Sequence, residues 1–314
     1  MSTILRKKSR RFRKRFNLWC IVRDSKSDAL FYVICYAIVA ILCLIVLYPL
    51  IYILSASFSS PAQVSSGRVW LFPVEPTLYS YSLILQYKNV FIGYGNTIFY
   101  TVVGTMINVA LTMICAYPLS RREFSGRYVC SLIFVFTMVF NAGMIPNYIL
   151  IRDLHLMNTR WAMILPGAIS AYNMIVARTF IQNSIPNELL EASKLDGCDD
   201  FQYFFHIVLP LSTTVISVIT LYYAVTHWNS YFNAFLYLSD RKLYPLQIFL
   251  RQILVQNNFD TSEVTDPELA QQLQGLNEVL KYSIIVVSSA PLMCLYPFVQ
   301  KHFVKGVMIG SVKG

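Results

Sequence analysis

The chain has 314 residues, of which 56% are hydrophobic and only 13% are charged. Soluble globular domains carry about 25% charged residues, so an ordinary soluble protein is excluded. The net charge of +10 comes largely from the N-terminus, and membrane orientation explains it better than nucleic-acid binding. We expect an all-α membrane protein.

Residues 1–28 are polar and basic, and we predict a cytoplasmic arm. Lys and Arg clusters beside a first membrane helix hold that end of the chain in the cytoplasm. The apolar run that follows is too long for a signal-peptide core and lacks a small-residue cleavage site, so no cleavage is expected. An RNA-binding arm is the alternative, but a basic cluster is the ordinary topological signal.

Six runs almost free of charge have about the twenty residues needed to span a bilayer. Each is expected to be helical, because the backbone must satisfy its own hydrogen bonds in lipid. The predicted spans cover about 30–55, 91–119, 128–150, 161–181, 207–235 and 282–299. With the N-terminus inside, the C-terminal tail 301–314 is also cytoplasmic. The chain then divides into a first helix with its outer loop (29–90) and a transmembrane core (91–300).

Two predicted outer segments are long. Residues 56–90 contain Pro61, Pro73 and Pro76 among aromatic residues, which indicates a folded loop with a short surface helix. The outer loop 238–280 includes a candidate helix at 246–255 and a polar stretch at 256–274. A loop of this length is a natural landing site for an external solute-binding protein, and a passive linker is the alternative.

Several polar side chains fall inside or beside the spans, where they are costly unless they face protein or water. A polar lining for a solute path is one interpretation, and helix packing by small polar residues such as Thr213, Ser217 and Thr220 is the other. The candidate path residues are Asn141, Asn173, Tyr223, Trp228, Asn229, Tyr231 and Asn233. Amide groups bond sugar hydroxyls, and aromatic faces cover the apolar side of a sugar ring.

The sequence contains no Gly-x-x-x-x-Gly-Lys-Ser/Thr phosphate loop and no catalytic or metal-ligand motif. The seven cysteines include no Cys-x-x-Cys pair and do not indicate a metal site or a disulfide framework. Energy must therefore come from another subunit or from an ion gradient. His227 has no intramembrane carboxylate beside it, which argues against a gradient-driven carrier.

The inner loop 182–206 is acidic. Residues 187–195 predict a short helix after Pro186, and Gly197 is expected to end it with a left-handed backbone. Asp199 or Asp200 then caps a second short helix that runs toward Pro210. This helix–turn–helix segment, which we call the knuckle (187–200), has a shape suited to docking a partner.

The knuckle carries a specific pattern: Glu191-Ala192-Ser193, three residues, Gly197, nine residues, then Ile207-x-Leu209-Pro210. This spacing resembles the "EAA" loop of membrane permeases in bacterial binding-protein-dependent ABC importers. Ser193 stands where the family most often has Ala. From about residue 93 to residue 310 the chain is most similar to the carbohydrate branch, the maltose-type permeases, and within it to importers of oligosaccharides or polysaccharide fragments.

The resemblance implies a type I ABC importer permease fold in the bacterial plasma membrane, in contact with lipid, forming the path of a carbohydrate, expected to be an oligosaccharide. It implies a second homologous permease, as a heterodimer in preference to a homodimer, and an extracytoplasmic solute-binding protein. It also implies two ATP-binding subunits that carry ATP and Mg²⁺, so this chain binds no cofactor or metal, has no catalytic residue and is not an enzyme. No nucleic-acid partner is expected.

By the same resemblance, the knuckle sits in a cleft of an ATPase subunit and moves as a rigid lever when the ATPase pair closes. The implied coupling residues are Glu188, Glu191, Ala192, Ser193, Asp196, Gly197, Leu209 and Pro210. The tail 301–314 is a candidate second contact, with a plain charged tail as its alternative. A gradient-driven secondary carrier, a membrane enzyme and a scaffold of a secretion complex are the competing function classes.

Overall fold

The structure is a computed structural model that describes residues 26–86, 88–256 and 275–294, and every regular element in these ranges is helical. Most of the predicted arm 1–28, nearly all of the polar stretch 256–274 and the whole tail 301–314 lie outside the described residues.

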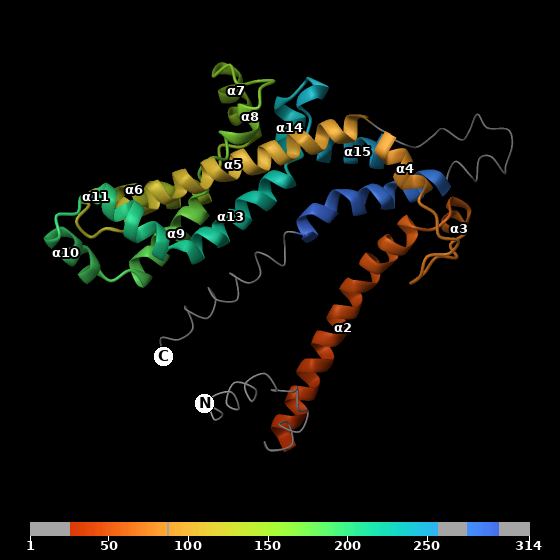
Figure 1. Cartoon of the computed structure of the whole chain (residues 1–314), viewed down its shortest axis with the longest axis horizontal. Helices are drawn as coiled ribbons and strands as arrows, with labels where there is room; N and C mark the ends of the chain where they lie inside the picture. The colour runs from red at the N-terminus through yellow and green to blue at the C-terminus, as the bar shows by residue number, and fades with distance from the viewer. Residues whose placement is uncertain (1–25, 87, 257–274, 295–314) are drawn as a thin grey trace, which may run out of the picture.

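Two helices are long and apolar enough to cross a membrane: α2 (Lys26–Ser57, 32 residues) and α5 (Lys88–Ser120, 33 residues). They confirm helices at the predicted spans 30–55 and 91–119. Helix α2 runs away from the other helices (Figure 1), and 0% of its most apolar window is buried. Its apolar surface is therefore open on all sides to lipid or to another subunit.

Helix α5 lies at the centre of the other helices and packs against α13 (Thr213–Trp228), α9 (Ala171–Ser184) and α15 (Leu246–Gln256) (Figure 1). The largest apolar cluster joins the C-terminal half of α5 to α9 and α13. A second cluster joins its N-terminal half to the short helices α8 (Trp161–Ile164) and α14 (Phe232–Tyr237).

Short helices connect these parts, as expected for the outer segment 56–90 and for 246–255. Ala56 at the end of α2 packs with residues of the outer loop and with Val279, so the outer loop and the last helix meet there. The remaining elements in this region are α3 (Pro61–Ser65), α4 (Tyr79–Gln86), the 3-10 helix η4 (Arg241–Leu243) and a helix at 275–294.

The predicted third span, 128–150, is wrong as one continuous helix. The chain forms α6 (Arg127–Val139) and α7 (Met144–Asp153), which meet at an angle of 117°. Gly143 has φ of +88°, a left-handed conformation that no helix interior accepts, and the side chain of Asn141 accepts its backbone N–H.

The fourth and fifth predicted spans are also interrupted. In 161–181, four residues of α8 are followed by a break, and Ser170 then caps α9 by accepting the backbone N–H of Asn173. In 207–235, the helical segment 200–211 meets α13 at an angle of 78° near Ser212. If each bent pair counts as one span, up to four spans are present among the described helices.

Candidate functional site

The knuckle forms as its local signals predict, and the whole of its second helix is included in it from here on, to Tyr203. Helix α10 (Asn187–Leu195) begins after Pro186, and Gly197 follows it with φ of +78°. Asp199 caps α11 (Asp200–Tyr203) by accepting the backbone N–H of Gln202 at 2.6 Å, and Gln202 reaches back to complete a capping box. Three independent turn signals therefore fix the angle between the two helices.

Most of the predicted coupling residues lie on the outer surface of the knuckle. The side chains of Glu188, Glu191, Ala192 and Asp196 are exposed. Ser193 differs, because it is buried and its Oγ donates to the carbonyl of Leu190 at 2.8 Å. The acidic face is thus available to a partner, while Ser193 belongs to the inner face that packs on the protein.

Two large apolar residues at the tip of the knuckle were missed by the sequence interpretation. Leu195 is 89% exposed and Phe201 is 77% exposed. Full burial of such a side chain is worth about 1.5–3 kcal/mol, so covering this pair against a partner would be favourable. The signal was present in the sequence, since both residues stand among acidic residues in a segment predicted to leave the membrane.

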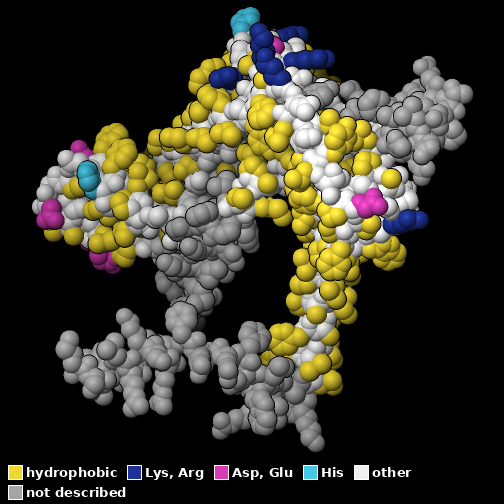
Figure 2. Space-filling view, turned by 45° about the vertical axis from the view of Figure 1, so that its right-hand side comes forward, with side chains coloured by type: hydrophobic (Ala, Val, Ile, Leu, Met, Phe, Trp, Pro, Cys, Tyr) yellow, Lys and Arg dark blue, Asp and Glu magenta, His cyan; other side chains and the backbone are white. Residues whose placement is uncertain are grey.

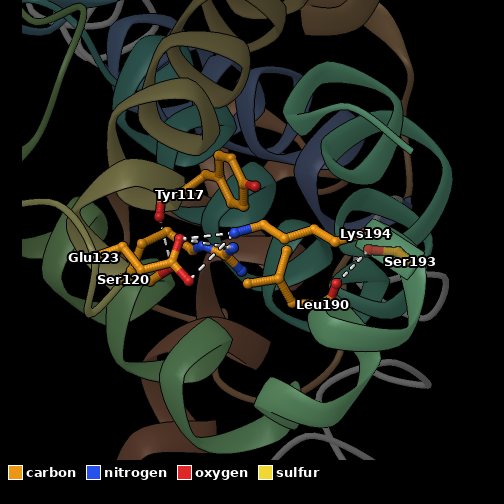
Figure 3. A network of polar contacts seen from close by, with 7 residues as sticks. Tyr117, Ser120, Glu123, Leu190, Ser193 and Lys194 are labelled. Atoms are coloured by element: carbon orange, nitrogen blue, oxygen red, sulfur yellow. Dashed lines mark hydrogen bonds and ion pairs between the residues drawn. The ribbon is translucent and has the colours of Figure 1, made fainter. Parts of the chain in front are cut away.

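An ion pair and a stacked guanidinium attach the knuckle to the end of α5. Lys194 Nζ lies 3.1 Å from Glu123 Oε2 in the connection between α5 and α6, as Figure 3 shows. The guanidinium of Arg121 lies over two neighbouring rings, 5.5 Å from the centre of Tyr117 and 5.3 Å from the centre of Tyr203. Burial raises the pKa of Tyr203, against the lowering effect of Arg121, so this ring is a neutral partner.

An irregular helical segment, residues 204–211, links the knuckle to α13. The π-helix η3 (Phe204–Val208) leads into the single turn α12 (Leu209–Leu211), which contains the predicted coupling residues Leu209 and Pro210. Leu209 packs partly into the largest apolar cluster, whereas Pro210 is exposed. Single turns of π-helix often mark functional positions, and only the turn α12 separates this one from the bend at Ser212.

Two of the candidate path residues are tied into the helix packing. Tyr223 is 3% exposed, and its hydroxyl bonds Thr112 of α5 at 2.7 Å and accepts the backbone N–H of Ser170 at 2.9 Å. Trp228 is buried and donates its Nε1–H to the carbonyl of Ser288 at 3.1 Å. These contacts support packing, and a path role for the two residues stays a prediction, as it does for the buried Asn173.

Of the other candidates, the three asparagines are exposed and Tyr231 is half-buried. Asn229 and Asn233 are exposed beyond the end of α13, and Asn229 donates to the carbonyl of Val225 at 3.0 Å. Tyr231 lies under the guanidinium of Arg251, at 4.6 Å from its ring centre. Asn141 is exposed at the bend between α6 and α7, on a different part of the chain. Asn229, Tyr231 and Asn233 thus follow one another where α13 gives way to α14, whereas Asn141 comes from a different segment.

A stripe of buried polar residues on α5 was also missed, although its spacing of three and four residues is helical. In its middle, Asn108 donates to His227 Nε2 of α13 at 3.0 Å. Gly104 lies directly beside the imidazole and leaves room for it. The stripe consists of Asn96, Thr97, Thr101, Thr105, Asn108 and Thr112.

The end of the molecule at the top of Figure 2, away from the knuckle, is basic. Asn158, with φ of +56°, joins two segments there, since its Oδ1 accepts the backbone N–H groups of Ser239 at 3.0 Å and Asp240 at 2.8 Å. Dark blue side chains gather at this end in Figure 2, and magenta ones at the knuckle. The exposed basic residues at this end lie in segments predicted to be outside the membrane, and we call them the outer basic cluster: Arg152, His155, Arg160, Arg241 and Lys242.

Comparisons with known proteins agree with this geometry. Residues 18–309 match the family described as "Binding-protein-dependent transport system inner membrane component". The chain is 40% identical to the polygalacturonan/rhamnogalacturonan transport system permease protein YtcP of Bacillus subtilis, over 91% of this chain and 99% of that protein. It is 38% identical to Protein LplC of the same organism, over 86% and 90% of the two chains.

A solved structure is similar over most of the fold. It is a chain from the crystal structure of a bacterial ABC transporter involved in the import of the acidic polysaccharide alginate. The TM-score is 0.81 and the sequence identity is 37%, with 89% of this chain and 99% of that chain covered.

Proposed function

Because this chain belongs to the family of inner membrane components of binding-protein-dependent transport systems, and is a permease subunit of a bacterial ABC importer, we propose that its knuckle is the element that couples it to an ATPase. The observation that carries this proposal is the exposed surface of the knuckle, which presents Glu188, Glu191 and Asp196 together with the large apolar side chains of Leu195 and Phe201. Charge at the rim and apolar area at the centre are typical of protein interfaces.

The coupling motion passes through rigid connections. The capped turn at Gly197 and Asp199 fixes the two knuckle helices, and Lys194 and Arg121 hold them against α5. Movement of the knuckle is then transmitted to α13 through η3 and α12, where Leu209 and Pro210 lie. A change in ATPase separation supplies the differential contact that such a two-state change requires.

The proposed assembly contains a second homologous permease, expected as a heterodimer, and two ATP-binding subunits that hold ATP and Mg²⁺. An extracytoplasmic solute-binding protein docks on the outer loop 238–280. Six spans and cytoplasmic termini complete the proposed topology, with 29–90 as first helix and outer loop and 91–300 as core. The family consists of importer permeases, so ATP hydrolysis is assigned to the partner subunits and an ion-gradient carrier is set aside.

The proposed substrate is an oligosaccharide that carries carboxylates. The relatives named above support a carbohydrate, and one of them imports an acidic polysaccharide. The outer basic cluster supports the acidic class, because five basic residues face the side from which the substrate arrives while Asp153 and Asp240 are its acidic neighbours. Such a cluster raises the local concentration of anions.

The proposal is tested with the assembled transporter carrying Glu191→Lys. We expect the variant chain to insert and to pair with the second permease, while the ATPase subunits dissociate on purification or hydrolyse ATP without uptake. Arg68→Glu, a charge reversal at an exposed residue of the outer loop, is the matched control and should keep both properties. Normal uptake by the Glu191→Lys transporter would remove the coupling role from the knuckle.

A further inference from the structure

A cavity of about 260 Å³ lies between the C-terminal end of α5 and the start of α10. Three arginines line it, Arg121, Arg122 and Arg127, together with the amide side chains of Gln182 and Asn187. No carboxylate is among its lining residues in the described part of the chain. Arg122 and Arg127 have no ion-pair partner among the described residues, and positive charges without a counter-ion in a confined space favour an anionic occupant.

Arg121 is held in place but its donors are not used up. Its stacking on Tyr117 and Tyr203 fixes the guanidinium, yet its buried Nη2 has no hydrogen-bond acceptor. The nearest carboxylate, Glu123, is 3.8 Å away and is engaged by Lys194. The first turn of α10, whose N-cap residue Pro186 makes no side-chain cap, adds backbone N–H groups that favour an anion.

An apolar groove of about 450 Å³ continues from this cavity along α6. The two share Arg127 and Gln182, and the groove is lined further on by Tyr128, Leu132 and Val135. Arg178 also lines the groove, but it already donates to the carbonyl of Leu119 at 3.1 Å and to Ser131 Oγ at 2.9 Å. A charged cavity that opens into an apolar groove on a membrane helix fits an amphiphile rather than a free ion.

We propose that this composite site binds one anionic phospholipid, with its phosphodiester among Arg121, Arg122 and Arg127 and one acyl chain in the groove along α6. Arginine suits this role, because its planar guanidinium donates two parallel hydrogen bonds to phosphate oxygens. Since Asn187 and Tyr203 of the knuckle line the same cavity, the bound headgroup braces the knuckle against α5. The proposed function places this lipid in the cytoplasmic leaflet, so the choice of leaflet rests on that proposal. The binding of the lipid does not rest on it.

The test is native mass spectrometry of the purified full chain with phosphatidylglycerol or with phosphatidylcholine of the same acyl chains. We expect selective retention of phosphatidylglycerol. The double variant Arg122→Gln/Arg127→Gln should bind phosphatidylglycerol about tenfold or more weakly than the wild-type chain does. Arg68→Gln removes an exposed charge on the outer loop and should have no effect. Arg122→Lys/Arg127→Lys keeps the charges and should retain most of the binding, which separates loss of the site from misfolding.

A second variant tests the lipid against free phosphate. Val135→Trp fills the groove and should weaken binding of phosphatidylglycerol while leaving the arginines untouched. If Val135→Trp retains phosphatidylglycerol as well as wild type does, or if an equal concentration of inorganic phosphate displaces the lipid, then the occupant of the site is not a phospholipid. Equal retention of both lipids, or of phosphatidylglycerol by wild type and Arg122→Gln/Arg127→Gln, would overturn the site altogether. Because the chain is studied without its ATPase, these results are independent of the coupling proposal.

Discussion

Lys194 of the knuckle and Glu123 of the α5–α6 connection form an ion pair across 71 residues of sequence, with Nζ 3.1 Å from Oε2. The side chains are 50% and 63% exposed, so the pair contributes only about 0.2–1 kcal/mol to stability. Its geometry matters more than its strength, since it ties the proposed lever to the central helix.

The first prediction reverses this pair. Lys194→Glu should change the unfolding temperature by no more than a few degrees, but it should lower uptake per ATP hydrolysed, because the knuckle loses one attachment to α5. The double variant Glu123→Lys/Lys194→Glu should restore coupling. Arg68→Glu, at an exposed residue outside the outer basic cluster, is the control for charge reversal and should leave uptake per ATP unchanged. A double variant as impaired as the single one would contradict the role of the pair.

The second prediction concerns the turn at Gly197. A Cβ at this position would meet no atom within 4 Å, so Gly197→Ala carries only the left-handed backbone cost of about 1 kcal/mol. Gly197→Asn should cost less, because Asn tolerates this conformation. Gly197→Pro cannot adopt φ of +78° and should reorient the two knuckle helices, which abolishes coupled uptake while the chain still inserts. Uptake assays on membrane vesicles with matched expression measure how the activities of the Asn, Ala and Pro variants rank. A fully active Gly197→Pro variant would refute the role of this turn.

The third prediction concerns the contact between α5 and α13. A Cβ added at Gly104 would lie 2.5 Å from His227 Nε2, so Gly104→Ala should push the two helices apart and destabilise the protein by about 1–3 kcal/mol. Gly95→Ala on the same helix meets nothing within 4 Å and should be neutral or slightly stabilising. Thermal unfolding in detergent compares the two. Equal unfolding temperatures would show that the imidazole does not need the space.

The knuckle was predictable because its signals are local. Pro186, Gly197 and Asp199 each act on neighbouring backbone, so the sequence was enough to place α10, the turn and α11. The helix breaks were not predicted, because hydrophobic length determines whether a segment enters the membrane but not whether it is one helix. Gly143 and Ser170 break their runs through a local turn and a helix cap, but Gly and Ser also occur inside membrane helices, so neither residue type by itself marks a break.

Side-chain roles inside the membrane were the hardest to predict. Tyr223 and Asn229 are both polar residues of one predicted span, yet one is bonded between three helices and the other is exposed. The sequence pattern placed both among the candidate path residues. The residues that distinguish them, such as Thr112 and Ser170, are distant from them in sequence, so no local pattern reveals the difference.

The fourth prediction separates these two residues. Tyr223→Phe removes a hydroxyl bonded to both Thr112 and Ser170 and should destabilise the protein by about 1–3 kcal/mol without changing substrate preference. Tyr222→Phe, at an exposed position on the same helix, should leave stability unchanged. The double variant Asn229→Leu/Asn233→Leu should show the opposite pattern: the stability of the protein stays normal, and its substrate handling changes. The unfolding temperature and competition between substrates for uptake, measured on the same preparations, decide between the two roles. An unchanged transport profile in the asparagine variant would mean that Asn229 and Asn233 serve helix packing.

The fifth prediction concerns the outer basic cluster. Arg241→Gln/Lys242→Gln should raise the KM for an oligosaccharide that carries carboxylates, because capture depends on long-range attraction by exposed charges. Uptake of a neutral oligosaccharide, if any is transported, should not change, nor should kcat. The defect should shrink as salt is raised from low to physiological concentration, since the screening length falls to about 8 Å and weakens the wild-type advantage. Arg68→Gln/Lys88→Gln removes the same charge from residues outside the cluster and serves as the control. A salt-independent defect, or one equal for neutral and acidic substrates, would mean that Arg241 and Lys242 support the fold of η4 rather than capture of an anion.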